Sequence, residues 1–293
     1  MKYAYFPGCS LKGTGRAYEE SFLAVFRALG VEMAEIEDWN CCGATAYMAV
    51  DEARALALAA RNLALAEKQQ CGDLVAPCNG CYLILMKSEK WINESPETSR
   101  NIQRVMREAG LEYSGKVAVR HPLEILLNDI GLEAIKSKAR RTLKGLRVAP
   151  YYGCQIVRPY ATFDDQYRPM TMDRLLESLG AAVVDYRLKT RCCGGALTGT
   201  IPDVGQRMAY ILLHEAKRCG ADVMAVCCPL CHFNLDSYQK EIKAHYPGDA
   251  AIPAVYFMQL LGLALGLDAA ALGLDRNIVP AKALWAELAP AAV

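Results

Sequence analysis

Arg191-Cys192-Cys193-Gly194-Gly195, near the middle of the chain, is the stretch that decides how the sequence is organised. An earlier copy of it reads Asn40-Cys41-Cys42-Gly43-Ala44. A lone cysteine after a glycine precedes each copy, and a CxxC pair follows each one. Each half therefore carries five thiols in one order: Cys9, Cys41, Cys42, Cys78 and Cys81 in the first, and Cys154, Cys192, Cys193, Cys228 and Cys231 in the second.

The spacing of these cysteines indicates an internal repeat. Matching cysteines of the two halves lie 145 to 151 positions apart, and both CxxC cysteines are separated from their counterparts by 150. Residues outside the motifs keep nearly the same step, since Ala28-Leu29-Gly30 corresponds to Ser178-Leu179-Gly180. A repeat unit of this length fits one domain. We therefore expect two cysteine-rich domains, residues 1–144 and 145–293.

Composition narrows the class of protein. A chain of 293 residues that is 53% apolar and 22% charged has enough apolar material for two ordinary cores. The net charge of +1 gives no field that would hold a polyanion, so nucleic acid is not an expected partner. Residues 1–7 lack the pattern of a secretory signal, which predicts a cytoplasmic protein. In a reducing cytosol, 13 cysteines indicate metal ligation or thiol chemistry rather than disulfides.

Alternating strand-like and helix-like segments predict the fold class. Short β-rich runs at residues 2–6, 73–76, 147–149 and 222–226 each lead into a cysteine motif, and a helical pattern follows. This order predicts two tandem repeated α/β domains with short, mostly parallel sheets flanked by helices and with the cysteines at strand ends. The apolar run 251–267 contains Pro253 and Gln259 and is shorter than a membrane span, so we expect a strand and a buried helix there. We also expect a helix break near Ser95-Pro96, a helix from Arg168 to Leu179, and a solvated connection between the halves at residues 133–143.

Five thiols in each half favour an iron–sulfur cluster over the alternatives. A structural zinc ion needs four ligands, usually from two CxxC pairs, and five thiolates exceed that number. Two adjacent cysteines point in different directions, so a pair that ligates suits an object larger than one ion. The ferredoxin spacing of cubane clusters is absent, and a thioredoxin-like CxxC leaves six of the motif cysteines unexplained.

The repeated pattern of a lone cysteine, Cys-Cys-Gly and CxxC resembles the cysteine-rich CCG domain, and two such domains in one chain resemble the B subunit of heterodisulfide reductase. The resemblance covers nearly the whole chain. It implies two non-cubane 4Fe-4S clusters, each held by five cysteines: Cys9, Cys41, Cys42, Cys78 and Cys81 for the first, and Cys154, Cys192, Cys193, Cys228 and Cys231 for the second.

The same resemblance implies an oxidoreductase that acts on sulfur. Each cluster would deliver one electron to a small-molecule disulfide lying between the two, or the reverse reaction would oxidise two thiols. An alternative is an iron–sulfur subunit that relays electrons without touching a substrate, and an open or an occluded gap between the two sets would distinguish these functions. The chain has no flavin fingerprint or cubane motif, so an iron–sulfur C-type subunit and a flavin-containing A-type subunit are the implied partners.

A few other residues are candidates for the site. His232 directly follows a motif cysteine and could donate a proton to a departing thiolate, although a histidine bonded to backbone at a helix start is an equal alternative. Arg158, Arg191 and His121 are candidates for binding substrate, with ordinary surface or structural roles as the alternative for each. Of the leftover cysteines, Cys71 and Cys219 are expected to be small buried residues, and Cys227 to point into the sheet.

Overall fold

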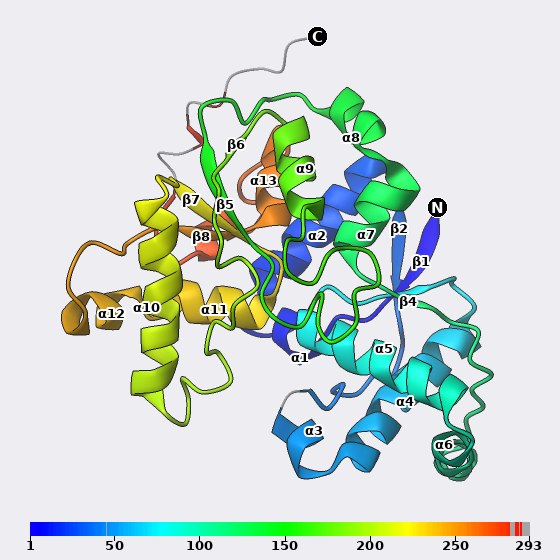
Figure 1. The fold of residues 1–293 in the computed structure, drawn as a ribbon. Coiled ribbons are helices and arrows are strands. Elements are labelled where there is room, and N and C mark those ends of the chain that lie inside the picture. Colours follow the sequence, from blue (N-terminus) through cyan, green and yellow to red (C-terminus); the bar gives the residue numbers. More distant parts are fainter. Residues whose placement is uncertain (45, 282–284, 287, 289–293) are drawn as a thin grey trace.

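The structure, a computed structural model, describes residues 1–44, 46–281, 285–286 and 288, and it contains two four-stranded parallel sheets (Figure 1). The first has the order β2-β1-β3-β4 and the second the order β6-β5-β7-β8. The strands are β1 (Lys2–Tyr5), β2 (Glu32–Glu35), β3 (Leu74–Val75), β4 (Val119–Arg120), β5 (Arg147–Tyr151), β6 (Ala182–Val183), β7 (Val223–Val226) and β8 (Ala254–Tyr256). The predicted α/β fold class, with two repeats of parallel strands flanked by helices, is confirmed.

Both sheets reverse their strand order at the same place. β1 lies between β2 and β3, and β5 lies between β6 and β7, so the chain switches direction between β1 and β3 and again between β5 and β7. Ligands of open α/β sheets bind beyond the carboxyl ends of strands at such a switch point. The lone cysteine and the CxxC pair of each half directly follow these two strands.

Helices flank the sheets, and three of the motif cysteines, Cys9, Cys81 and Cys231, lie in them. The helices of the first half are α1 (Gly8–Leu11), α2 (Arg16–Leu29), α3 (Ala46–Val50), α4 (Glu52–Gln69), α5 (Asn79–Glu94), α6 (Pro96–Glu108), α7 (Pro122–Ile125), η1 (Leu126–Ile130) and α8 (Leu132–Lys138). Those of the second half are α9 (Thr171–Ser178), α10 (Pro202–Arg218), α11 (Pro229–Ser237), α12 (Gln239–His245), α13 (Phe257–Ala264) and η2 (Leu274–Arg276).

Side-chain caps fix several helix starts. The carboxylate of Asp51 accepts the Arg54 N–H, and the Ser95 hydroxyl accepts the Thr98 N–H where the sequence predicts a break. The helix expected from Arg168 begins later, because the Asp164 carboxylate holds the Met170 and Thr171 N–H groups.

Residues 133–143 differ from the expected solvated connection between the halves. They include most of α8, whose Ile135 side chain is fully buried. Leu143 is fully buried as well, so two apolar side chains in an otherwise basic stretch hold this connection against the core.

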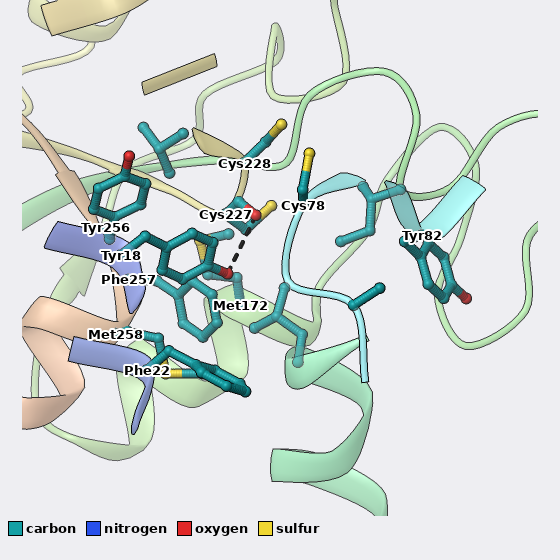
Figure 2. Close-up of a cluster of buried hydrophobic side chains, with 14 of the residues drawn as sticks. Tyr18, Phe22, Cys78, Tyr82, Met172, Cys227, Cys228, Tyr256, Phe257 and Met258 are labelled. Atoms are coloured by element: carbon teal, nitrogen blue, oxygen red, sulfur yellow. Dashed lines mark hydrogen bonds between the residues drawn. The ribbon is translucent and has the colours of Figure 1, made fainter. Parts of the chain in front are cut away.

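The two halves interlock. α13 of the second half packs on α2 of the first, and the rings of Tyr18 and Tyr256 stack with their centroids 4.4 Å apart (Figures 1 and 2). The Arg276 guanidinium makes two hydrogen bonds to the Glu20 carboxylate, at 2.8 and 2.9 Å. Buried residues of both halves form one continuous core. The division of the chain at residue 144 remains a prediction.

The apolar run 251–267 forms β8 and the fully buried helix α13. In the described part of the chain, no helix has the length and apolar character needed to cross a membrane.

Candidate functional site: two sets of five cysteines

A glycine with a positive φ angle precedes each lone cysteine. Gly8 has φ of 65°, and a Cβ atom there would lie 2.9 Å from the Cys81 sulfur. Gly153 has φ of 75°, and its Cβ would lie 3.2 Å from the Cys231 sulfur. Only glycine combines this backbone conformation with so close an approach. The lone cysteine is thereby brought to the second cysteine of the CxxC pair in both halves.

A second glycine turns the chain after each Cys-Cys pair. Gly43 and Gly194 have φ of 84° and 81°, and each lies against the helix that follows, α4 or α10. The first cysteine of each pair is exposed and the second is buried. The two side chains of a pair therefore point in different directions, as expected.

The CxxC pairs cap two helices. Cys78 and Cys228 occupy the N-cap positions of α5 and α11, so Cys81 and Cys231 lie in the first turn. The Cys81 sulfur is 3.2 Å from that of Cys42, and in the second half the matching distance, Cys231 to Cys193, is 3.4 Å. Each set thus has a pair of buried thiols in contact with each other and at least one exposed thiol at its edge.

The two sets meet at Cys78 and Cys228. These thiols come from opposite halves, each shifts the pKa of the other, and Figure 2 shows their sulfur atoms close together. Their exposed fractions are 7% and 3%. The repeat therefore produces one continuous group of thiols across the seam between the halves, and its centre is closed to solvent.

Shared protons shift the pKa values of these thiols in opposite directions. Hydrogen bonds from neighbouring thiols, led by Cys41, Cys154 and Cys231 respectively, lower the pKa of Cys42, Cys192 and Cys228. The same kind of contact raises the pKa of Cys41, Cys154 and Cys231. In each set, neighbouring thiols therefore favour the thiolate form of at least one sulfur, the form in which cysteine binds metals.

Ten cysteines are available to hold a metal or a cluster. No group of three or more His, Cys, Asp or Glu side chains in the described residues is arranged to hold a single metal ion. The thiols instead meet in pairs and extend from a buried centre to an exposed edge. A donor set of sulfur alone suits zinc or an iron–sulfur cluster, and five sulfurs exceed the four that zinc takes.

The four other candidates lie in different surroundings. Arg158 donates a hydrogen bond to the Thr190 carbonyl, and its charge contributes to the low pKa of Cys192, whereas the Arg191 side chain is exposed. His121 and His232 are both buried, and burial lowers their pKa values to about 3 and about 4. Both imidazoles are therefore neutral at pH 7.

The residue after each CxxC pairs its ring with a second aromatic residue. In the first half tyrosine follows the CxxC and pairs with histidine, and in the second half histidine follows it and pairs with tyrosine. Tyr82 and His121 meet edge to face at 5.5 Å, and at the matching positions His232 and Tyr256 stack at 4.0 Å. The His232 Nε2 atom bonds to the Ala254 carbonyl, whereas His121 Nε2 and the Tyr256 hydroxyl have no partner among the described atoms.

Buried amides hold the Cys-Cys loops, a role that the sequence interpretation missed. Asn62 of α4 exchanges two hydrogen bonds of 3.0 Å with the Asn40 backbone, just before Cys41. In the second half, Asn234 donates to the Cys193 carbonyl at 2.6 Å. For Asn62, the available signal was a polar residue in a helical stretch rich in alanine and leucine.

The three leftover cysteines lie outside the pairwise contacts of the two sets. Cys71 and Cys219 are half-exposed rather than buried, because they end helices at the surface. Cys227 is fully buried at the seam between the halves, where its sulfur lies 3.3 Å from the Tyr152 carbonyl oxygen. Asn79 of the first half approaches the same sulfur and donates to Tyr152 O at 2.6 Å.

The duplicated cysteine order has a counterpart in a known protein family. Residues 3–86 and 148–236 both match the family described as CCG, cysteine-rich domain. The chain belongs to this family. The matched segments contain every motif cysteine of their half, so the repeat seen in the sequence, the two sheets and the two thiol sets coincide.

Two relatives of similar length match this chain over nearly its whole length. The chain is 31% identical to the B subunit of the ferredoxin:CoB-CoM heterodisulfide reductase of Methanosarcina mazei, covering 95% of this chain and 94% of that one. It is also 31% identical to "8-methylmenaquinol:fumarate reductase membrane anchor subunit" of Wolinella succinogenes, with 97% and 99% covered. This CCG protein is therefore related to the B subunits of heterodisulfide reductases.

A solved structure supports the fold. The "Crystal structure of a hypothetical protein from Helicobacter pylori" superposes with a TM-score of 0.76 at 13% identity, covering 95% of this CCG protein and 52% of that chain. At this identity the likeness extends to the fold alone.

Proposed function

We propose that this CCG protein binds two non-cubane 4Fe-4S clusters and acts as the disulfide-reducing or dithiol-oxidising subunit of a heterodisulfide reductase-like complex. The ligands are the two five-cysteine sets: Cys9, Cys41, Cys42, Cys78 and Cys81, and Cys154, Cys192, Cys193, Cys228 and Cys231. Support comes from the all-sulfur donor sets, the matching glycine cradles and the kinship with the B subunits of heterodisulfide reductases.

The meeting of the two sets at Cys78 and Cys228 carries the proposal. A cluster at each set would supply one electron, and a disulfide has two equivalent sulfur ends that each need one. The chain contributes two nearly equivalent scaffolds, related by the repeat, that hold their thiols on opposite sides of one seam.

Other side chains serve the same reaction in this proposal. Arg158 and Arg191 offer cations beside the exposed Cys192 for an anionic thiol or disulfide. His232 stays the proposed proton donor; because burial keeps its imidazole neutral at pH 7, it would first take up a proton from solvent before passing one to a thiolate. His121 stays a candidate for substrate contact through its unpartnered Nε2 atom.

A second function, electron relay without substrate contact, is favoured by one observation. Cys78 and Cys228 are almost fully buried where the sets meet, and an occluded gap suits transfer of electrons better than entry of a disulfide. The kinship with a subunit of a fumarate reductase points the same way. In either function the proposed partners are a C-type iron–sulfur subunit and a flavin A-type subunit, in the cytoplasm.

Metal analysis tests the cluster assignment first. The protein is purified without oxygen, and iron, sulfide and zinc are measured per chain. We expect about eight irons with matching sulfide, falling to about four in Cys81→Ser and in Cys231→Ser, with Cys219→Ser as the control that keeps all eight. One or two zinc ions and no sulfide would contradict the assignment.

Single-turnover measurements separate the two functions. Dithionite-reduced protein is mixed with a small disulfide in the absence of partners, and released thiol is counted. The catalytic subunit releases about two thiols per chain and changes its paramagnetic resonance spectrum when thiol is added. A relay subunit does neither, although its iron content and its reduction by dithionite are the same.

A further inference from the structure

The two halves differ most in the crevice on the outer side of the helix after Cys-Cys-Gly. In the first half, α4 and α6 enclose a groove of about 680 Å³. In the second half the matching crevice, between α10 and α12, has a volume of only about 10 Å³, because the rings of Tyr210 and Tyr246 stack across it at 4.7 Å. Side chains therefore fill this crevice in the second half, whereas it is open in the first half.

The groove has an apolar floor and a cationic edge. Its apolar lining includes Leu56, Ala57, Ile102, Met106 and the Trp91 ring. Two of its charged residues are neutralised, since Arg54 pairs with Asp51 at 3.1 Å and Glu52 with Lys87 at 2.5 Å.

Three arginines of α6 lie beside the groove, with Glu97 and Glu108 at the two ends of the helix. Arg104 lines the groove, and Arg100 and Arg107 extend the same face of the helix beside it. None of the three has an ion pair among the described residues. They span two helical turns, about 10 Å, which is longer than one small anionic group.

The groove adjoins the loop that carries Cys41. Arg61 lines the groove and bonds to the carbonyl oxygen of Asp38 and, at 3.0 Å, to the Asn40 side chain. Tyr47, from the other side of the Cys-Cys-Gly turn, lines it as well. Whatever fills the groove therefore lies next to the loop that carries the exposed Cys41.

The geometry points to a docking site for an acidic amphipathic helix of a partner subunit. An apolar groove takes the apolar stripe of such a helix, and carboxylates along its flank match the row of Arg100, Arg104 and Arg107. α6 itself is 13 residues, about 20 Å, long enough to run beside three or four turns of a partner. That this partner exchanges electrons with the first cysteine set rests on the proposed function, whereas the docking does not.

A photo-crosslinking experiment in the native host tests the site. A benzophenone amino acid replaces Val105 on α6, and in a control it replaces Val204 on α10, which is exposed to a similar degree (39% and 43%). We expect Val105 to crosslink to one partner subunit, at a peptide with an apolar stripe and acidic flanks, and Val204 not to reach that peptide. Crosslinking to a second copy of this chain, to lipid or to nothing overturns the proposal.

Two variants add a quantitative test of the chemistry. Arg104→Glu combined with Arg107→Glu reverses the charge, and Ala57→Trp fills the groove as the stacked tyrosines fill its counterpart. Each is expected to weaken capture of the crosslinked subunit at least tenfold, while Arg174→Glu on α9 leaves it unchanged. Iron per chain is measured in parallel, so a failed cluster assignment is distinguished from a failed docking site. Capture that is equal in all four proteins contradicts the proposal.

Discussion

The first and second halves of the molecule keep the same thiols and the same glycines but differ in what surrounds them. Gly8, Gly43, Gly153 and Gly194 have similar φ angles in matching places, because each lets the backbone pass close to a sulfur or a helix. Other positions have diverged: Ala55 corresponds to Gly205, Glu89 corresponds to Gln239, and histidine and tyrosine are exchanged in the ring pairs. The comparison separates what holding five thiols requires from what each half can vary.

The largest effect on stability is expected when Gly205 is replaced by alanine, the residue that the first half has at the corresponding position 55. A Cβ atom on Gly205 would lie 2.6 Å from the Thr198 Cα and 2.7 Å from its N atom, and backbone cannot move aside cheaply. Gly205→Ala should lower the free energy of unfolding by about 3 kcal/mol or more. Ala55→Gly, the reverse exchange, should cost only about 1–2 kcal/mol through helix propensity and a lost methyl group. Anaerobic thermal unfolding compares them, and equal losses would contradict this account.

The two Cys-Cys-Gly turns should also respond unequally. A Cβ on Gly194 would lie 2.9 Å from the Gly205 Cα, whereas one on Gly43 would lie 3.3 Å from the Ala55 Cα. Both substitutions place alanine in a left-handed conformation, which alone costs about 1–2 kcal/mol. Gly194→Ala should therefore cost about 2–3 kcal/mol and Gly43→Ala about 1–2 kcal/mol. A larger loss of melting temperature for Gly43→Ala would mean that the two turns are supported differently from what the distances indicate.

Replacing Glu89 with the residue of the second half should stabilise the protein at neutral pH. Burial raises the pKa of Glu89 to about 7 although its carboxylate accepts the Val119 N–H. A raised carboxyl pKa gives stability that is complete below about pH 4.5 and is lost as the pH rises through about 7. Glu89→Gln should remove this loss and add about 1 kcal/mol at pH 8, after allowance for solvent screening. Unfolding from pH 5 to pH 8 measures it, and an unchanged pH slope would contradict the assignment.

The smallest effect is expected from an ion pair between the halves. Arg276 and Glu20 are both partly exposed, and water screens such pairs. Arg276→Ala should reduce the free energy of unfolding by less than about 1 kcal/mol. A loss several times larger would show that this contact, and not the packing of α13 on α2, holds the halves together.

Much of the fold followed from the sequence because the repeat supplies each prediction twice. The strands that lead into cysteines, the break at Ser95-Pro96 and the buried strand and helix after Pro253 are all confirmed. Each depends on local signals: β-rich runs, caps and apolar length. The late start of α9 could not be foreseen, because the Asp164 carboxylate that sets it lies six residues upstream in a loop.

For the candidate site, the ligand roles of the ten cysteines stay predictions, and their surroundings were not foreseen. Cysteine spacing identified both sets, but the contact of Cys78 with Cys228 depends on how the halves pack, which no local pattern encodes. The same holds for Asn79, which reaches Tyr152 in the other half. The roles of His232, His121, Arg158 and Arg191 stay predictions.

The packing of α13 on α2 has a consequence for biosynthesis. As the nascent chain leaves the ribosome, α2 and its Tyr18 and Phe22 side chains emerge early, but the helix that covers them is among the last elements to be made. The first cysteine set can assemble while that face is still uncovered. The seam at Cys78 and Cys228 closes only late in synthesis, so the proposed clusters would have a window for insertion before the two halves lock.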